Sequence, residues 1–262
     1  MLTIRTLKRI CQSIIALTAT LVLAGCVSTV PPSKYQVDEE RALDSHVQLA
    51  LKYIEAQNRE SARHHLRKAF EIDRKSVEAT FAMAMLYQLE GEPKMAEEYF
   101  KRTLKLDRDY TRARNNYGAF LFGRERYKEA YEQFEIASED LDYDNRAQAM
   151  VNLGRTAIKL DKPERAEAVF EHANRLNAAM PTVKYELAAL NFAQNDYAEA
   201  KKYLAAYEQI ARPVPQTLLL GIKVERIFGN KDKEASYALL LKNQYPYSAE
   251  YLEYKQMLEN QD

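Results

Sequence analysis

Four histidines are the first side chains to consider for chemistry, because imidazole binds metals and transfers protons. They are His46, His64, His65 and His172. His64 and His65 are adjacent, so on a helix they point about 100° apart and cannot share a metal as an i, i+4 pair can. Glu60 and His64 have that spacing, but such pairs are common on exposed helix faces. The histidines therefore predict no metal site.

Carboxylates are numerous, but they stand among lysines and arginines at helical spacing, as in Lys94, Glu97, Glu98 and Lys101. This pattern is typical of a solvated helix face with i, i+4 charge pairs. No nucleophile elbow (G-x-S-x-G), phosphate-binding loop or H-E-x-x-H motif occurs. We expect neither catalysis nor a bound cofactor, and the alternative is an enzyme whose polar residues gather in an irregular site.

The composition indicates which elements position these side chains. The 262 residues include only 7 glycines and 8 prolines, too few for the turns of an all-β chain. Thirty-eight basic and 38 acidic side chains cancel, so no nucleic-acid footprint is indicated. A mean hydropathy of −0.51 excludes a protein with many membrane spans. The sequence predicts an all-α fold after its first 26 residues.

An Ala followed four residues later by Phe or Leu recurs at intervals of 34 to 36 residues. The pairs are Ala62/Leu66, Ala96/Phe100, Ala130/Phe134, Ala166/Phe170, Ala200/Leu204 and Ala235/Leu239, and a small residue precedes each of the first five by twelve positions, at Ala50, Ala84, Gly118, Gly154 and Ala188. Two small residues facing each other allow antiparallel helices to approach closely, and the large residue fills the space beside them. The pattern predicts stacked helix pairs.

This period of 34 residues resembles the tetratricopeptide repeat, which implies a right-handed superhelix with a concave groove. Six units tile residues 43–248, namely 43–76, 77–110, 111–144, 147–180, 181–214 and 215–248. The sixth unit is degenerate, because Lys223 stands where we expect its small residue. Ser248 predicts the start of a capping helix within 249–262, whose polar residues would close the superhelix against water.

The N-terminal 25 residues have the features of a secretory signal peptide. Basic residues precede an apolar stretch, Ile10–Leu23, that ends at Leu23-Ala24-Gly25-Cys26. These last four residues resemble the bacterial lipobox, which implies cleavage before Cys26 and lipidation of that residue. Several acyl chains are needed because one gives only reversible membrane attachment. The alternative is a secreted protein in which Cys26 is incidental.

The residues after the cysteine indicate where such a protein would reside. Val27 and Ser28 replace the Asp that, in lipoproteins of this kind, retains the chain at the inner membrane. The resemblance therefore implies the periplasmic leaflet of the outer membrane. Residues 26–42 contain Pro31-Pro32 and lack periodicity, so we expect an extended tether there.

The first helices of units one and two carry a second apolar stripe. Val47, Leu51 and Ile54 occupy i, i+4 and i+7, and Phe81 and Met85 continue the stripe. We interpret these five residues as a partner-binding groove suited to the apolar face of a helix. The alternatives are ordinary packing and coverage by residues 31–43.

The other positions of these first helices have different expected roles. We expect Leu49, Ala50 and Tyr53 to face the second helix of unit one. In later units the stripe becomes mixed, with Asn115, Ala119 and Phe122, then Val151, Arg155 and Ile158, then Tyr185, Ala189 and Phe192. Asn115, Asn116 and Asn152 resemble the asparagines of carboxylate-binding repeats. The lysines that such a site needs are absent, so we do not assign it.

A lipobox followed by six such repeats resembles the PilF/PilW lipoproteins of type IV pilus biogenesis. Three stretches carry the resemblance: Asn115–Phe122, Tyr127–Phe134, and Leu218–Lys223 with Ala235-Ser236-Tyr237 after it. The resemblance implies a pilotin, which binds secretin subunits and promotes their outer-membrane localisation and multimerisation. No nucleic acid and no small-molecule substrate are expected as partners. A lipoprotein scaffold that recruits periplasmic cell-wall hydrolases is the alternative, and it would lack the third stretch.

Overall fold

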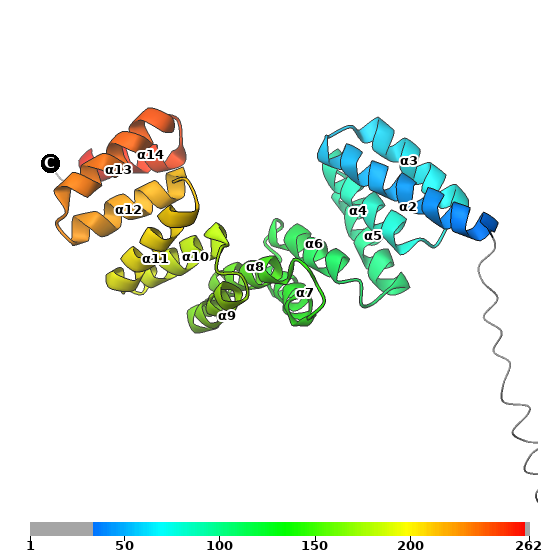
Figure 1. The fold of residues 1–262 in the computed structure, drawn as a ribbon, viewed down its shortest axis with the longest axis horizontal. Helices are drawn as coiled ribbons and strands as arrows, with labels where there is room; N and C mark the ends of the chain where they lie inside the picture. The colour runs from blue at the N-terminus through cyan, green and yellow to red at the C-terminus, as the bar shows by residue number, and fades with distance from the viewer. Residues whose placement is uncertain (1–33, 260–262) are drawn as a thin grey trace, which may run out of the picture.

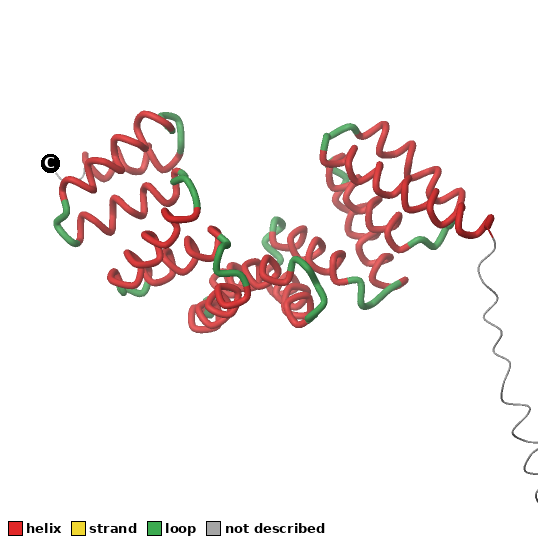
Figure 2. The backbone as a smooth tube through the Cα atoms, viewed as in Figure 1, coloured by secondary structure: helices red, strands yellow, loops and turns green. Residues whose placement is uncertain are grey.

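The computed structural model describes residues 34–259, and the side chains from residue 38 onward. The predicted signal peptide, residues 1–25, lies outside this range, as do Cys26 and the start of the predicted tether. Within the described range every regular element is an α-helix, as Figure 2 shows.

The helices follow each other with short connections. In chain order they are α2 (Lys34–Glu55), α3 (Arg59–Ile72), α4 (Val77–Glu90), α5 (Pro93–Leu106), α6 (Thr111–Phe122), α7 (Tyr127–Glu139), α8 (Arg146–Lys159), α9 (Pro163–Leu176), α10 (Pro181–Ala193), α11 (Tyr197–Ile210), α12 (Pro215–Ile227), α13 (Lys231–Gln244) and α14 (Ala249–Glu259).

Consecutive helices pack as antiparallel pairs, from α2 with α3 to α12 with α13, and α14 packs against α12 and α13. The pairs stack side by side into an open arc, with the first pair at one end and α14 at the other (Figure 1). Each unit therefore contacts mainly its neighbours, as in other repeat proteins. The predicted all-α superhelix of six hairpins and a C-terminal helix is confirmed.

Several helices begin at N-cap serines or first-turn prolines that can be recognised in the sequence. The hydroxyl of Ser76 accepts a hydrogen bond from the Ala79 amide at 3.1 Å, and Ser248 does the same for Tyr251 at 3.1 Å. Pro93 and Pro163 occupy the first turn of α5 and α9, where a missing N–H costs no helical hydrogen bond.

The first helix differs from the sequence interpretation in its starting point. α2 begins at Lys34, so residues 34–42, which we expected in the tether, are helical. The last nearby helix breaker in the sequence is Pro32, and the segment after it contains good helix formers such as Glu39, Glu40 and Arg41. α2 can therefore extend beyond the core although its first residues have no periodic apolar pattern.

Close approach of small and large residues builds the core of each hairpin. A Cβ placed on Gly118 would lie 2.8 Å from Cε1 of Phe134, so only glycine fits there. Gly154 meets Phe170 in the same way. Phe134 and Phe170 are almost completely buried, and the contacts join the two helices of units three and four.

The sixth unit follows the same rule in a different register. Its small residue is Gly221, whose Cβ would lie 2.7 Å from Cε2 of Tyr237, sixteen residues later, as in units three and four. Our assignment of Lys223 to the small position, and of Ala235 and Leu239 to the core pair, is therefore wrong. Leu239 is 59% exposed, whereas Tyr237 is 7% exposed. The large position of this unit holds a tyrosine, which the pattern of Ala followed by Phe or Leu does not include.

The capping helix is less polar outside than expected. None of the α14 residues is buried, and Leu252 and Leu258 are 52% and 42% exposed. Tyr251, Tyr254 and Met257 pack against the apolar cluster of α12 and α13. Because α14 packs against α12 and α13 on one side only, apolar side chains remain on its other face.

Candidate partner-binding groove

Three of the five predicted groove residues are part of the core. Val47, Ile54 and Phe81 are only 2%, 9% and 1% exposed, so they do not present a surface to a partner. Val47 and Ile54 belong to the cluster in which α2 packs against α3 and α4. Phe81 belongs to the next cluster, where its ring packs against Phe100 and Tyr110. The assignment of these three residues to a binding surface is corrected.

The other two predicted residues keep a partial surface. Leu51 and Met85 are half-buried, and both pack against the two neighbouring clusters of core residues. Leu49, which we expected to face α3, is instead 38% exposed. Leu51 and Met85 are the only members of the predicted set that a partner can contact.

Three adjoining hollows lie over units two to six. Ala119, Phe122, Phe134, Asn152 and Arg155 line a hollow of about 100 Å³. A second hollow of about 390 Å³ shares Ala119 with it and extends toward unit two. A third, of about 430 Å³, shares Arg155 and extends over α10 and α12. We call this continuous surface the inner groove and define it by Ala119, Phe122, Asn152, Arg155 and Tyr185.

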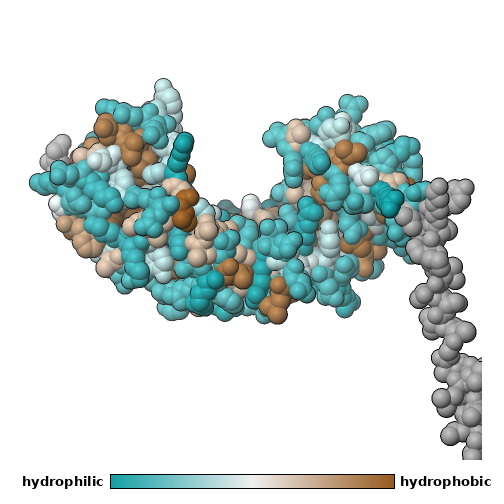
Figure 3. All heavy atoms as spheres, viewed as in Figure 1, coloured by the Kyte–Doolittle hydropathy of each residue, from teal (hydrophilic) through white to brown (hydrophobic). Residues whose placement is uncertain are grey.

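The inner groove follows the concave side of the arc. Its residues come from α6, α8 and α10, which are the first helices of their units. Figure 3 shows the molecule hollowed between the two ends of the arc, with polar and apolar side chains mixed along the surface. A mixed lining suits a ligand that carries both peptide groups and apolar side chains.

A ladder of amide side chains crosses the inner groove. Gln148 Nε2 donates to Asn152 Oδ1 at 3.1 Å, and Asn152 Nδ2 donates to Asn115 Oδ1 at 3.1 Å. The second bond links α8 to α6, so it holds neighbouring units in register. Amide side chains both donate and accept, which matches them to the N–H and C=O groups of a polypeptide.

Arg155 is held in the inner groove by a buried acid. Its Nε donates to Glu186 Oε1 at 2.7 Å, and Nη2 lies 2.6 Å from the same oxygen. Glu186 is 8% exposed, whereas the Arg155 side chain is 41% exposed. A guanidinium has five N–H donors, so this anchored side chain retains donors that face the hollow.

Aromatic side chains border the groove at equivalent positions. Phe122 packs edge-on against Tyr127 with ring centroids 5.2 Å apart, and Phe192 packs against Tyr197 at 5.3 Å. Tyr185 lies on α10, the helix that also carries Phe192, and its burial raises the pKa of its hydroxyl. These rings are half-buried, so they combine a fixed position with an accessible edge.

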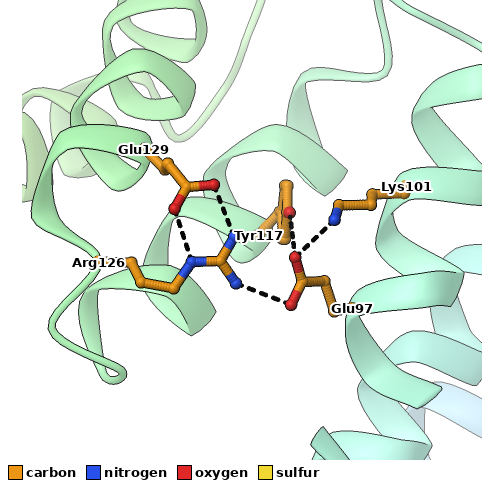
Figure 4. A network of polar contacts seen from close by, with 5 residues as sticks. All are labelled: Glu97, Lys101, Tyr117, Arg126 and Glu129. Atoms are coloured by element: carbon orange, nitrogen blue, oxygen red, sulfur yellow. Dashed lines mark hydrogen bonds and ion pairs between the residues drawn. The ribbon is translucent and has the colours of Figure 1, made fainter. Parts of the chain in front are cut away.

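A network of charges fixes unit two against unit three. Glu97 of α5 accepts hydrogen bonds from Arg126 Nη1 at 2.7 Å and from the Tyr117 hydroxyl at 3.1 Å, and it pairs with Lys101 at 2.7 Å. Arg126 also donates through Nε and Nη2 to Glu129, at 2.7 and 2.6 Å. Figure 4 shows Arg126 between the two carboxylates, one from each unit.

The protonation of this network reflects its geometry. The hydrogen bond from Arg126 lowers the pKa of Glu97 to about 2, against the opposing effect of burial. Burial and the adjacent Glu97 carboxylate raise the pKa of the Tyr117 hydroxyl. The pKa of Arg126 is raised by its two carboxylate partners. Glu97 is therefore ionised and Tyr117 neutral at physiological pH, so the network links the two units by charge.

The histidines contribute contacts between α2 and α3. His46 Nδ1 and His65 Nδ1 are 3.0 Å apart, and His65 stacks on Tyr53. Within residues 38–259 no three His, Cys, Asp or Glu side chains gather as a metal site would require. Over the helices from Lys34 to Glu259, none combines the length and apolar character needed to cross a bilayer.

The sequence contained a signal for the inner groove that our interpretation did not use. Asn115, Ala119, Arg155 and Tyr185 occur at the same helical spacing as Val47 and its neighbours, but they form a mixed stripe and not an apolar one. The apolar stripe of units one and two is mostly buried in the core, whereas the mixed stripe of the later units keeps accessible side chains. A period alone does not separate these two outcomes.

Comparisons with known proteins identify two of the repeats and a relative that covers most of the chain. The tetratricopeptide repeat family model matches residues 77–110 and 147–180, which are the second and fourth units. The Type IV pilus assembly protein PilF of Pseudomonas aeruginosa is 39% identical over 235 residues, covering 89% of this chain and 93% of that protein.

Solved structures give the same relationship. A structure described as a functional characterization of Pseudomonas aeruginosa PilF superposes with a TM-score of 0.78 at 39% identity, covering 84% of this chain and 99% of the other. The crystal structure of PilW, described as a widely conserved type IV pilus biogenesis factor, superposes with a TM-score of 0.71 at 28% identity, covering 80% and 96%.

Proposed function

The chain belongs to the PilF/PilW family of tetratricopeptide-repeat proteins of type IV pilus biogenesis, and we propose that it is an outer-membrane pilotin. In this proposal, acyl chains on Cys26 hold the protein in the periplasmic leaflet of the outer membrane. The superhelix binds secretin subunits and promotes their localisation and multimerisation in that membrane. Binding is the whole activity, and no bond is made or broken.

The inner groove is the observation that carries this proposal. It is a preformed concave surface in which contacts between neighbouring units hold the amide ladder and Arg155, and a contact within unit three holds the ring of Phe122. A rigid site needs little ordering when it binds, so the loss of conformational entropy falls mainly on the client segment. A segment in extended or helical form offers the peptide groups and apolar side chains that such a lining accepts.

The end of the arc near the membrane provides a second contact. Leu51 and Met85 lie in the first two units, on the helices that precede α6 along the superhelix. We propose that they meet an apolar part of the same client. The hydrolase-recruiting scaffold is not favoured, because the chain's relatives serve pilus assembly.

The test introduces a charge into the inner groove without disturbing the core. Ala119 is exposed on α6, so Ala119→Glu places a carboxylate in the hollow and keeps the helix intact. We expect at least an order-of-magnitude loss of binding to purified secretin, because the longer side chain fills the hollow and its carboxylate occupies the Arg155 donors that line it. In cells, heat-resistant secretin multimers should decrease when this variant replaces the native chain.

The matched control is Ala168→Glu, at an exposed position of α9 outside the groove. It should bind secretin as the native chain does. Normal multimers and normal surface pili after deletion of the whole protein would refute the pilotin proposal. Loss of multimers on deletion, with no effect of Ala119→Glu, would place the interface elsewhere. Cys26→Ser should remove the acylated form from outer-membrane fractions, and unchanged acylation and fractionation would exclude lipid on Cys26.

A further inference from the structure

A basic, aromatic-floored hollow lies on the opposite side of the arc from the inner groove. Arg67, Phe70, Glu71, Arg74, Met83, Tyr99 and Arg102 line a volume of about 470 Å³. Met83 is 7% exposed and Phe70 and Tyr99 are half-buried, so the floor is apolar. We call this surface the outer basic pocket and define it by Arg67, Arg74, Arg102, Phe70 and Tyr99.

The three arginines of the outer basic pocket carry charge that the protein does not neutralise. Within residues 38–259, none of them forms an ion pair with a carboxylate. Arg102 lies over the Tyr99 ring at 5.7 Å and donates to the Arg74 carbonyl at 3.3 Å. The one acid in the lining, Glu71, pairs with Lys68 at 2.8 Å. Three guanidinium groups around an apolar floor fit an anion attached to apolar chains.

Charge along the outer side of the arc changes sign with distance from the N-terminus. Residues 59–76, which contain α3, have six basic and three acidic side chains. Residues 127–145, which contain α7, have one basic and seven acidic side chains. A negatively charged surface would attract the first outer helix and repel the third, which favours one orientation of the arc.

The outer basic pocket also lies at the end of the first hairpin from which the chain leaves toward Cys26. α3 runs antiparallel to α2, and the contact of His46 with His65 sets their register. The C-terminal residues of α3, Arg67 to Ile72, therefore lie beside the part of α2 that leads back to Lys34. Seven residues lie between Cys26 and Lys34, so an extended chain covers at most about 30 Å from one to the other.

We propose that the outer basic pocket binds the anionic headgroups of phospholipids in the membrane that holds the lipidated N-terminus. This inference rests on the proposed anchoring through Cys26, which brings the pocket within reach of the bilayer surface. Arg67, Arg74 and Arg102 pair with headgroup phosphates, and Phe70 and Tyr99 contact the glycerol region. The contact turns the basic face toward the membrane and leaves the inner groove open to the periplasm.

The test measures vesicle binding without the acyl chains. Residues 26–262 with Cys26→Ser retain every helix described from Lys34 to Glu259, so this chain keeps the folded body. It is mixed with vesicles of phosphatidylcholine alone or of phosphatidylcholine with phosphatidylglycerol, and bound protein is measured by flotation. We expect binding only to the anionic vesicles, decreasing as salt is added.

The decisive variant is Arg67→Gln/Arg74→Gln/Arg102→Gln. Its control, Arg212→Gln/Lys231→Gln/Lys242→Gln, removes the same charge from exposed residues of units five and six. We expect the pocket variant to lose at least about tenfold in vesicle affinity and the control to lose less than about twofold, with both retaining native helical content. Equal binding to neutral vesicles, an unchanged pocket variant, or an equal loss in the control would overturn the proposal.

Free phosphate is the alternative anion that the three arginines of the outer basic pocket could bind in place of a lipid headgroup. If inorganic phosphate raises the melting temperature of the native chain but not of the pocket variant, while vesicles do not bind, the pocket takes free anions and the membrane proposal fails. The vesicle assay does not depend on acylation or on secretin. Its failure is therefore distinguishable from failure of the pilotin proposal, which the multimer assay tests.

Discussion

The charge network around Glu97 should make the stability of the repeat array depend on pH. Glu97 accepts hydrogen bonds from Arg126 and Tyr117 and pairs with Lys101, and it joins unit two to unit three. Glu97→Gln keeps the shape of the side chain but removes its charge. We expect this variant to unfold more easily than the native protein at neutral pH, because Arg126 loses one of its two carboxylate partners.

The magnitude follows from the shifted pKa. A decrease in the pKa of Glu97 from 4.5 to about 2 corresponds to at most about 3.4 kcal/mol. The Glu97 and Arg126 side chains are 21% and 32% exposed, so solvent screening reduces this to about 1–2 kcal/mol. Because the pKa is lower in the folded state, the stabilisation is complete above about pH 5 and is lost as the pH falls toward 2.

Urea unfolding followed by circular dichroism measures the effect at pH 7 and at several lower values. The native protein should exceed Glu97→Gln by about 1–2 kcal/mol at pH 7, and the difference should shrink as the pH falls from 5 toward 2. Glu98→Gln is the control, since Glu98 is an exposed neighbour on α5, and it should change stability by less than about 0.5 kcal/mol. A difference for Glu97→Gln below about 0.5 kcal/mol at pH 7, or one that does not vary with pH, would refute the reasoning.

Two further predictions concern the packing of individual units. Gly154→Ala should destabilise the protein by about 1–3 kcal/mol in urea unfolding, because its methyl group meets the fixed ring of Phe170. Gly123→Ala is the control, since its Cβ has no neighbour closer than 3.6 Å, and it should be neutral or slightly stabilising. If both substitutions have the same effect, close approach is not the reason for the glycine. Burial, and then the two neighbouring imidazoles, lower the pKa of His65, so the melting temperature should fall as the pH drops below about 6.5. This decrease should be smaller in His65→Gln and unchanged in His172→Gln, and an equal decrease in all three proteins would exclude His65 as its source.

The period of the sequence was sufficient to determine the repeat architecture. The contacts that define each hairpin join residues sixteen apart, such as Gly118 with Phe134, so their types recur at a fixed spacing along the chain. Helix starts depend on single local residues, as Ser76 and Pro93 illustrate. Interactions within one unit recur in every unit, so the residue types that make them can be recognised in the sequence alone.

Only the tertiary structure decided which surfaces remain accessible. Val47 and Phe81 are buried in apolar clusters and do not face a partner, because each first helix packs on two sides. The bonds from Asn152 to Asn115 and from Arg126 to Glu97 join residues 37 and 29 positions apart, and no regular spacing predicts them. They depend on how one unit is rotated against the next, which is set by the side chains of both units together. The inner groove and the outer basic pocket arise from that rotation, so local sequence patterns determine the hairpins and the stacking of hairpins determines the sites.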